Sequence, residues 1–152
     1  MWSNGYHSYF RMKIRIKKLH SDAMLPSYAH GGLEDAGMDL RALERVVLTP
    51  GAAKAVSTGI AIELPSGYEA QVRPRSGLAL KNSVTVNFGT IDPGYRGEIR
   101  VVMFNLGAND YVIEKWDRIA QLIVARYESI DWEEGELSDS VRGDGGFGSS
   151  GR

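Results

Sequence analysis

Cysteine does not occur among the 152 residues of this chain. Disulfide bonds, thiolate metal ligands and cysteine nucleophiles are therefore excluded, and the composition suits a reducing compartment. No apolar run approaches the roughly 20 residues of a membrane span, and residues 1–19 hold no apolar stretch of secretory length. We therefore expect a cytoplasmic protein without a membrane partner.

Neither sign of charge prevails in the sequence. Eighteen basic and 19 acidic residues give a formal net charge of -1. A chain this balanced has no global field that would draw it to nucleic acid, so we expect no such partner and only local anion sites. His7, His20 and His30 are scattered outside every motif described below, and we interpret them as surface residues rather than metal ligands.

Short apolar runs separated by turn residues predict an all-β fold of the sandwich or barrel type. Residues 12–17 alternate apolar and basic side chains, which indicates a half-buried strand. Further strands are predicted at residues 38–41, 46–48, 53–64, 68–72, 99–105, 111–113 and 119–127. The one predicted helix is brief and runs from about Ser76 to Lys81.

The two ends of the chain differ in character from its middle. Acidic residues gather at 133–139, and residues 141–152 hold five glycines and two serines. Such a segment buries too little apolar surface to order itself. We therefore divide the chain into an N-terminal extension that need not be ordered (1–11), a β domain (12–137) and a flexible glycine-rich arm (138–152).

Two short segments contain residues suited to phosphate chemistry. Arg75, Ser76 and Gly77 stand where a predicted strand meets the predicted helix, and their guanidinium, hydroxyl and backbone N–H groups could hold an anion. The same residues suit a solvated turn equally well. Asp92, between Ile91 and Pro93, could hold a water molecule as a general base, although the tripeptide alone favours a simple turn former.

Single residues in two apolar runs and in the glycine-rich end are further candidates for a binding site. Asp39 points to the opposite face from its apolar neighbours, and without further context it is best interpreted as a surface residue. Gln121 needs either backbone partners or a phosphate if its amide is buried. Arg142 can bind a terminal phosphate and Phe147 can stack on a base, although composition alone favours a disordered terminus.

Five blocks of the sequence resemble, in order, spacing and content, the five motifs of the trimeric dUTPase family. They are AGMDLRA (36–42), RPRSGLALK (73–81), GTIDPGYRGEI (89–99), RIAQLIV (118–124) and RGDGGFGSSG (142–151). The resemblance implies a distorted jelly-roll or β-barrel-like subunit with one short helix, assembling as a homotrimer whose active sites are shared between subunits. It also implies hydrolysis of dUTP to dUMP and pyrophosphate, which keeps uracil out of DNA and supplies dUMP for thymidylate synthesis.

The resemblance further implies roles for individual residues. Asp92 corresponds to the base that activates the water attacking the α-phosphorus, and Asp39 to a residue that orients Arg75 or a metal-bound water. Mg²⁺ would be held by the triphosphate and waters, with no direct protein ligand. The implied catalytic residues are Asp92, Asp39 and Arg75, and those for substrate binding are Arg75, Ser76, Gly77, Asn87, Gly89, Ile91, Tyr95, Gln121, Arg142, Phe147, Gly148, Ser149 and Ser150.

Within that set, Tyr95 would pack beneath the deoxyribose and leave no room for a 2′-hydroxyl. The uracil pocket is less defined, because the segment before Asp92 is two residues shorter than a frequent bacterial form. Asn87 could line it, as could Val86, Phe88 or the backbone of the hairpin. In each case a tight wall would exclude the thymine methyl group.

Two other functions compete with dUTP hydrolysis. A dCTP deaminase shares the fold and much of the third block, but it resembles this chain less because it carries a glutamate acid/base where Val102 stands here. Without a carboxylate at that position deamination has no evident proton shuttle. A catalytically silent nucleotide-binding module is the second alternative, since fold alone does not determine function.

Overall fold

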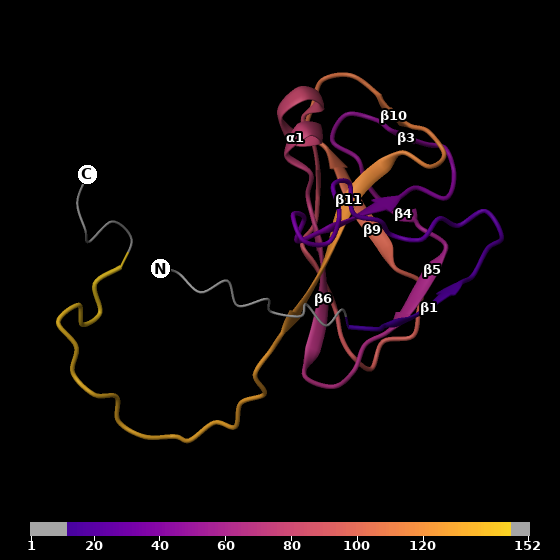
Figure 1. Ribbon diagram of the computed structural model, residues 1–152. Helices are drawn as coiled ribbons and strands as arrows, with labels where there is room; N and C mark the ends of the chain where they lie inside the picture. The colour runs from indigo at the N-terminus through magenta and orange to yellow at the C-terminus, as the bar shows by residue number, and fades with distance from the viewer. Residues whose placement is uncertain (1–11, 147–152) are drawn as a thin grey trace, which may run out of the picture.

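The computed structural model describes residues 12–146, and these form a β-rich body with one short helix and an extended C-terminal segment (Figure 1). The elements are, in chain order, β1 (Arg15–Lys18), β2 (Met38–Arg41), β3 (Val46–Leu48), β4 (Ala53–Ser57), β5 (Ile60–Glu63), β6 (Tyr68–Arg73), α1 (Ser76–Asn82), β7 (Val84–Val86), β8 (Gly89–Ile91), β9 (Arg100–Asn105), β10 (Tyr111–Ile113) and β11 (Arg118–Arg126). Within this range no helix is both long and apolar enough to cross a bilayer.

The strands form small antiparallel sheets rather than one continuous sheet. The largest has the order β2-β11-β6-β8, and a second has the order β4-β9-β7. Two strand pairs, β1-β5 and β10-β3, complete the body. The four-stranded sheet is the one that matters for function, because four of the five sequence blocks contribute to β2, β6, β8 and β11 or to the turns that follow them.

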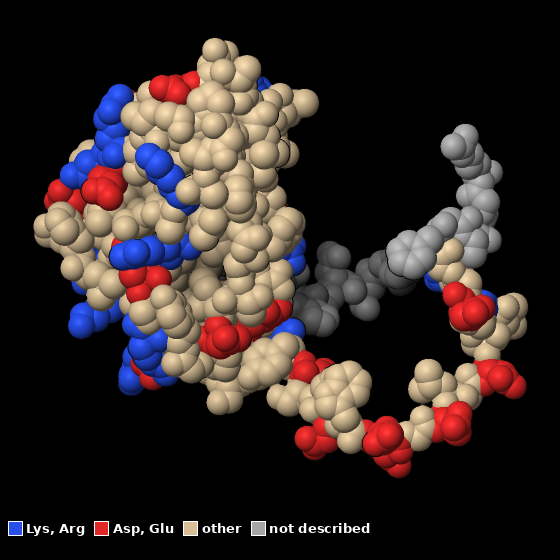
Figure 2. Space-filling view, turned by 180° about the vertical axis from the view of Figure 1, so that it is seen from behind, with Lys and Arg blue, Asp and Glu red and all other residues tan. Residues whose placement is uncertain are grey.

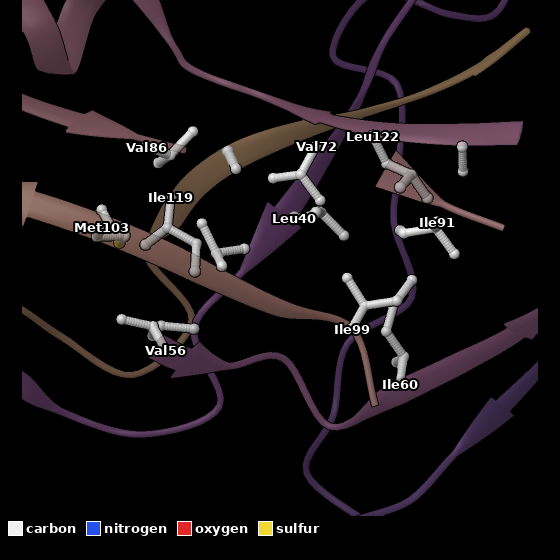
Figure 3. Close-up of a cluster of buried hydrophobic side chains, with 14 of the residues drawn as sticks. Leu40, Val56, Ile60, Val72, Val86, Ile91, Ile99, Met103, Ile119 and Leu122 are labelled. Carbon is white, nitrogen blue, oxygen red and sulfur yellow. The ribbon is translucent and has the colours of Figure 1, made fainter. Parts of the chain in front are cut away.

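One hydrophobic cluster lies between the sheets (Figure 3). Every sheet described above contributes to it, and its labelled members include Leu40, Ile60, Ile99, Met103 and Ile119. Alternate residues of a strand point to opposite faces, so β6 buries Ala70 and Val72 in the cluster while its other side chains stay nearer the surface. The two long strands β6 and β11 therefore have fixed faces, and polar residues next to buried ones must point away from the core.

The predicted strands at 38–41, 46–48 and 111–113 are confirmed to the residue, and the short helix is confirmed with one further residue. The single strand predicted at 53–64 is wrong, since β4 and β5 are separated at Thr58 and Gly59. Gly59 has a φ of +70°, which breaks the strand. The hydroxyl of Thr58 donates to the carbonyl of Ile99 and so satisfies a buried polar side chain at the break.

Two further expectations differ from the structure. The first predicted strand was expected to begin at residue 12 and to be half buried, but β1 begins at Arg15 and all four of its residues are exposed. Strands β7 and β8, three residues each, were not predicted.

The chain leaves the body after β11 and forms neither helix nor strand in residues 127–146. Figure 1 shows this segment sweeping outward from the end of β6 that lies opposite α1. Acidic side chains are strung along it in Figure 2, whereas most basic side chains visible in that view lie on the body. Among the residues that the structure describes, the hydrogen bonds of residues 140–145 stay within that stretch, as in the turn between Gly143 and Ser140.

Candidate active site

A polar hollow of about 380 Å³ opens beside the first, second and fourth blocks. Its lining includes Asp39 of β2, Arg75 at the start of α1, and Gln121 of β11. Gln121 pairs with Asp39 on one side and with Arg73 on the other, so the central strand of the sheet brings three blocks of sequence together. We call this the anion hollow.

The carboxylate of Asp39 is the centre of the anion hollow. It is only 7% exposed, which excludes the surface aspartate that the sequence alone favoured. One oxygen lies 3.4 Å from Nε of Arg75 and the other lies 3.5 Å from a terminal nitrogen of Arg118. A buried carboxylate needs such partners, because an unpaired charge away from water is costly.

Arg75 is held from two directions. Besides the ion pair with Asp39, its guanidinium donates a 2.9 Å hydrogen bond to the carbonyl oxygen of Arg118. Arg75 is also the residue before α1, and Ser76 and Gly77 follow it in the first, exposed turn of that helix. Asp39 and Arg75 are therefore in contact within one chain, whereas Ser76 and Gly77 are not part of the lining of the anion hollow.

The sequence analysis did not single out Arg118, Glu34 or Asp35 of the anion hollow, and Arg118 was quoted only as the first letter of the fourth block. His30 was interpreted as a surface residue, which agrees with its exposure. His30 is exposed but lines the hollow beside Asp35. Hydrogen bonds from the backbone and the ring of His30 lower the pKa of Asp35, so this carboxylate remains ionised at neutral pH.

A second hollow, of about 420 Å³, lies on the hairpin formed by the third block. Gly89 and Ile91 of β8 line it, together with Asp92 and Tyr95 of the following turn. The backbone N–H of Tyr95 donates to the carbonyl of Asp92 at 3.0 Å, which closes the turn that carries the carboxylate. We call this the hairpin hollow.

Tyr95 has a fixed position in the hairpin hollow. Its hydroxyl donates to the backbone carbonyl of Glu98 at 2.9 Å. The Glu98 carboxylate in turn accepts bonds from Nε of Arg100 and from the backbone N–H of Gly59, both at 2.9 Å. Partial burial raises the pKa of Glu98, but the hydrogen bonds from Arg100 and Gly59 outweigh it, and the net shift is downward.

The two hollows are separated along β6. Ile91 pairs with Ala70, so Asp92 lies near the level of Glu69, whereas Arg75 follows the opposite end of the strand. At about 3.3 Å per residue, the backbones of Asp92 and Arg75 are roughly 20 Å apart. The hollows share no lining residue. Asp92 and Arg75 of one chain therefore cannot both contact the same phosphate group.

The remaining predicted residues either lie outside both hollows or lie outside the residues that the structure describes. Asn87 is exposed, is not part of the hairpin hollow lining, and its side chain donates to the carbonyl of Phe88. Val86 is a buried core residue (Figure 3), so it does not line the uracil pocket. Arg142 makes a local bond to the carbonyl of Gly145. Phe147, Gly148, Ser149 and Ser150 lie outside the described residues.

Val102, which stands where a deaminase would carry its glutamate, lies on β9 between the buried residues Val101 and Met103 and is itself exposed. It therefore points away from the core, and an apolar side chain there offers no proton-transfer group.

Comparison with known proteins identifies the group to which this site belongs. The sequence profile of the dUTPase family matches residues 22–151. The chain belongs to the dUTPase family. The assignment predicted from the five blocks is therefore confirmed.

Individual relatives agree with the family match. A deoxyuridine 5′-triphosphate nucleotidohydrolase of Solibacter usitatus is 63% identical over 144 residues, covering 93% of this chain and 98% of the relative. The protein of the same name from Clostridioides difficile is 57% identical over 141 residues, covering 91% and 97%. The solved dUTPase of Staphylococcus bacteriophage 80alpha with dUpNHpp has a TM-score of 0.85 and 30% identity, covering 92% of this dUTPase-family chain and 99% of its own.

Proposed function

We propose that this protein hydrolyses dUTP to dUMP and pyrophosphate in the cytoplasm, keeping uracil out of DNA and supplying dUMP for thymidylate synthesis. One observation carries the proposal: Asp92 and Tyr95 share a hollow walled by the backbone of β8, in a chain that belongs to the dUTPase family. The hollow is concave, of ordinary ligand size, and combines an apolar wall with an exposed carboxylate.

In this proposal the hairpin hollow takes the nucleoside. The backbone at Gly89 and Ile91 pairs with the uracil edge, and the ring of Tyr95 packs beneath the deoxyribose. Asp92 accepts a proton from a water molecule as that water attacks the α-phosphorus, and the bond from the α-phosphorus to the bridging oxygen breaks to release pyrophosphate. Asp92 is suited to this step because its turn is closed by the hydrogen bond from Tyr95.

The anion hollow takes the triphosphate. Arg75 offers a guanidinium fork, Ser76 a hydroxyl for the α and β phosphates, and Gln121 an amide. Asp39 keeps Arg75 in place through its ion pair.

The separation of the two hollows supports an active site made by more than one subunit. A homotrimer of jelly-roll-like subunits would bring the hairpin hollow of one chain against the anion hollow of another. The arm at residues 138–152 would then close a neighbouring site, with Arg142 on the terminal phosphate and Phe147 on the base. Gly148, Ser149 and Ser150 would wrap further phosphate oxygens.

Magnesium would bind to this site together with the substrate rather than through direct protein ligands. Within the described chain no three His, Asp or Glu side chains are grouped to hold a metal ion. Asp39 is already paired with two guanidinium groups, so it suits contact with a metal-bound water better than direct coordination. Bound through the triphosphate and waters, Mg²⁺ would supply neutralisation of the charge that develops on the phosphates.

Pyrophosphate release from dUTP with magnesium, compared with dTTP, dCTP and UTP, tests the proposal. We expect turnover of dUTP alone. A protein that binds dUTP without turnover would be a silent binding module, and conversion of dCTP to a uracil nucleotide would identify a deaminase.

Asp92→Asn tests the role of the base. This variant should lose at least about a thousandfold in kcat while binding dUpNHpp with nearly unchanged affinity, because it removes the proton acceptor and keeps the turn. Asp110→Asn, an exposed aspartate in the turn before β10, is the matched control and should behave as the wild type. Lost binding in Asp92→Asn would contradict the assigned role.

A further inference from the structure

Strand β11 contains an irregularity beside the anion hollow. Ala120 pairs with Leu40 and Arg118 pairs with Arg41, so two steps along β11 match one step along β2. The extra residue is Ile119, and both Ile119 and Ala120 are buried. Consecutive buried residues are what a β-bulge produces, because it interrupts the alternation of faces.

The bulge decides where Arg118 points. In a regular strand Arg118 would share a face with Ala120 and Leu122, which are both core residues. With the bulge it lies instead on the face of Gln121 and lines the anion hollow. Bulges next to active sites re-aim side chains in this way.

Arg118 contacts both charged residues at the centre of the anion hollow. A terminal nitrogen lies 3.5 Å from one oxygen of Asp39, and its backbone carbonyl accepts a 2.9 Å bond from Arg75. The other Asp39 oxygen is the partner of Arg75. The three residues therefore form a closed arrangement in which each contacts the other two.

The charge balance of this arrangement gives Arg118 a function. Asp39 and Arg75 alone make a neutral pair, and Glu34 and Asp35 also line the hollow. Arg118 makes the centre positive by one charge, and its guanidinium has more donors than the Asp39 contact uses. Its side chain is 46% exposed, so it remains accessible from the hollow.

We infer that Arg118, re-aimed by the β11 bulge, is a positioning residue that holds Asp39 and Arg75 in their triphosphate-binding geometry and adds a second positive charge beside the Asp39 carboxylate. This inference rests on the proposed function. It concerns the phosphate end of the substrate only, so the hairpin hollow and its nucleoside contacts do not depend on it.

The test compares full-length Arg118→Gln, Arg118→Lys and the control Arg45→Gln, which removes an exposed guanidinium paired with Glu114. Binding of dUpNHpp and of dUMP is measured by calorimetry, and kcat and KM are measured with dUTP. Arg118→Gln should weaken dUpNHpp binding about tenfold or more and dUMP binding less than about threefold, because only the β and γ phosphates lose their support. Arg45→Gln should match the wild type.

Arg118→Lys restores the charge without the planar fork and should lie between the wild type and Arg118→Gln. It also keeps the test valid if Arg118→Gln does not fold. Wild-type affinity for dUpNHpp in both variants, or equal losses for dUpNHpp and dUMP, would overturn the inference. A wild-type protein that binds dUpNHpp but does not hydrolyse dUTP would instead refute the proposed function. The binding measurements on the Arg118 variants would still test the role of Arg118 in holding the triphosphate.

Discussion

Replacing Gly97 by alanine would displace the Tyr95 ring without substituting any residue proposed to contact substrate. A Cβ atom at position 97 would overlap Oη of Tyr95 and would lie 2.6 Å from its Cζ and 2.9 Å from its Cε2. Carbon atoms in contact keep about 3.5 Å apart, so the tip of the ring must move by about 1 Å. That movement breaks the hydrogen bond from Tyr95 to the carbonyl of Glu98.

The effect on stability should be small and the effect on catalysis large. Loss of one hydrogen bond at an exposed side chain costs about 0.5–1.5 kcal/mol at most. A displacement of about 1 Å at a substrate-positioning group can reduce the rate about a hundredfold. Since Tyr95 is proposed to exclude the 2′-hydroxyl, its displacement should also lower the preference for dUTP over UTP by about tenfold.

Gly94→Ala is the matched control, because it lies in the same turn and a Cβ atom there meets nothing within 4 Å. The prediction is tested by steady-state hydrolysis of dUTP and UTP by both variants and by their thermal unfolding. Gly97→Ala should lose kcat/KM and selectivity at a nearly unchanged Tm, and Gly94→Ala should lose neither. Wild-type selectivity in Gly97→Ala, or an equal loss in Gly94→Ala, would refute the role given to the Tyr95 ring.

Two further outcomes follow from the ion pairs and the sheet. The pKa of Glu98 is lowered, so its charge stabilises the fold above the unfolded-state pKa and ceases to do so as the pH falls through the folded-state pKa. Glu98→Gln should therefore cost about 1 kcal/mol near pH 7 in urea unfolding, and this cost should shrink as the pH falls below the ordinary Glu pKa of about 4.3. A pH-independent cost would contradict this. Asp92→Asn and Arg75→Gln chains, each inactive alone, can be mixed so that they assemble into random trimers. If each site takes Asp92 from one chain and Arg75 from its neighbour, about a quarter of wild-type activity should return. If each site lies within one chain, the mixture should stay inactive.

Much of the sheet could be predicted because its strands end at residues with strong turn preferences. Residues 46–48 are followed by a Pro-Gly pair, and 111–113 are preceded by Gly-Ala-Asn-Asp, so both strands were bounded correctly. The break at Gly59 could not be predicted in the same way, because Ser57 and Thr58 are not strong turn formers and a single glycine inside a strand pattern also fits a bulge. The positive φ of Gly59 is set by tertiary contacts, with Ala23 and Leu43 packed against that glycine.

Some residues of the candidate site could likewise be predicted from the sequence and others could not. Asp39, Arg75 and Gln121 could be named from the sequence because each stands in a block that resembles the family. Arg118 could not be placed, since strict alternation along 118–126 would have assigned its side chain to the core. The bulge at Ile119 depends on the register between β2 and β11, and a single sequence carries no direct record of that register.

Strand β6 explains why one chain contains every described group of the site and yet holds them in two places. A strand in the middle of a sheet is a stiff spacer, because both of its edges are bonded, here to β11 and β8. Asp92, the proposed base, lies near one end of β6 and Arg75 lies at the other, and they cannot approach each other without breaking the four-stranded sheet. Catalysis by a single chain would require that disruption, whereas a second chain can present its own anion hollow to the hairpin with both sheets intact. The rigidity of β6 thus makes assembly the less costly way to complete the proposed site.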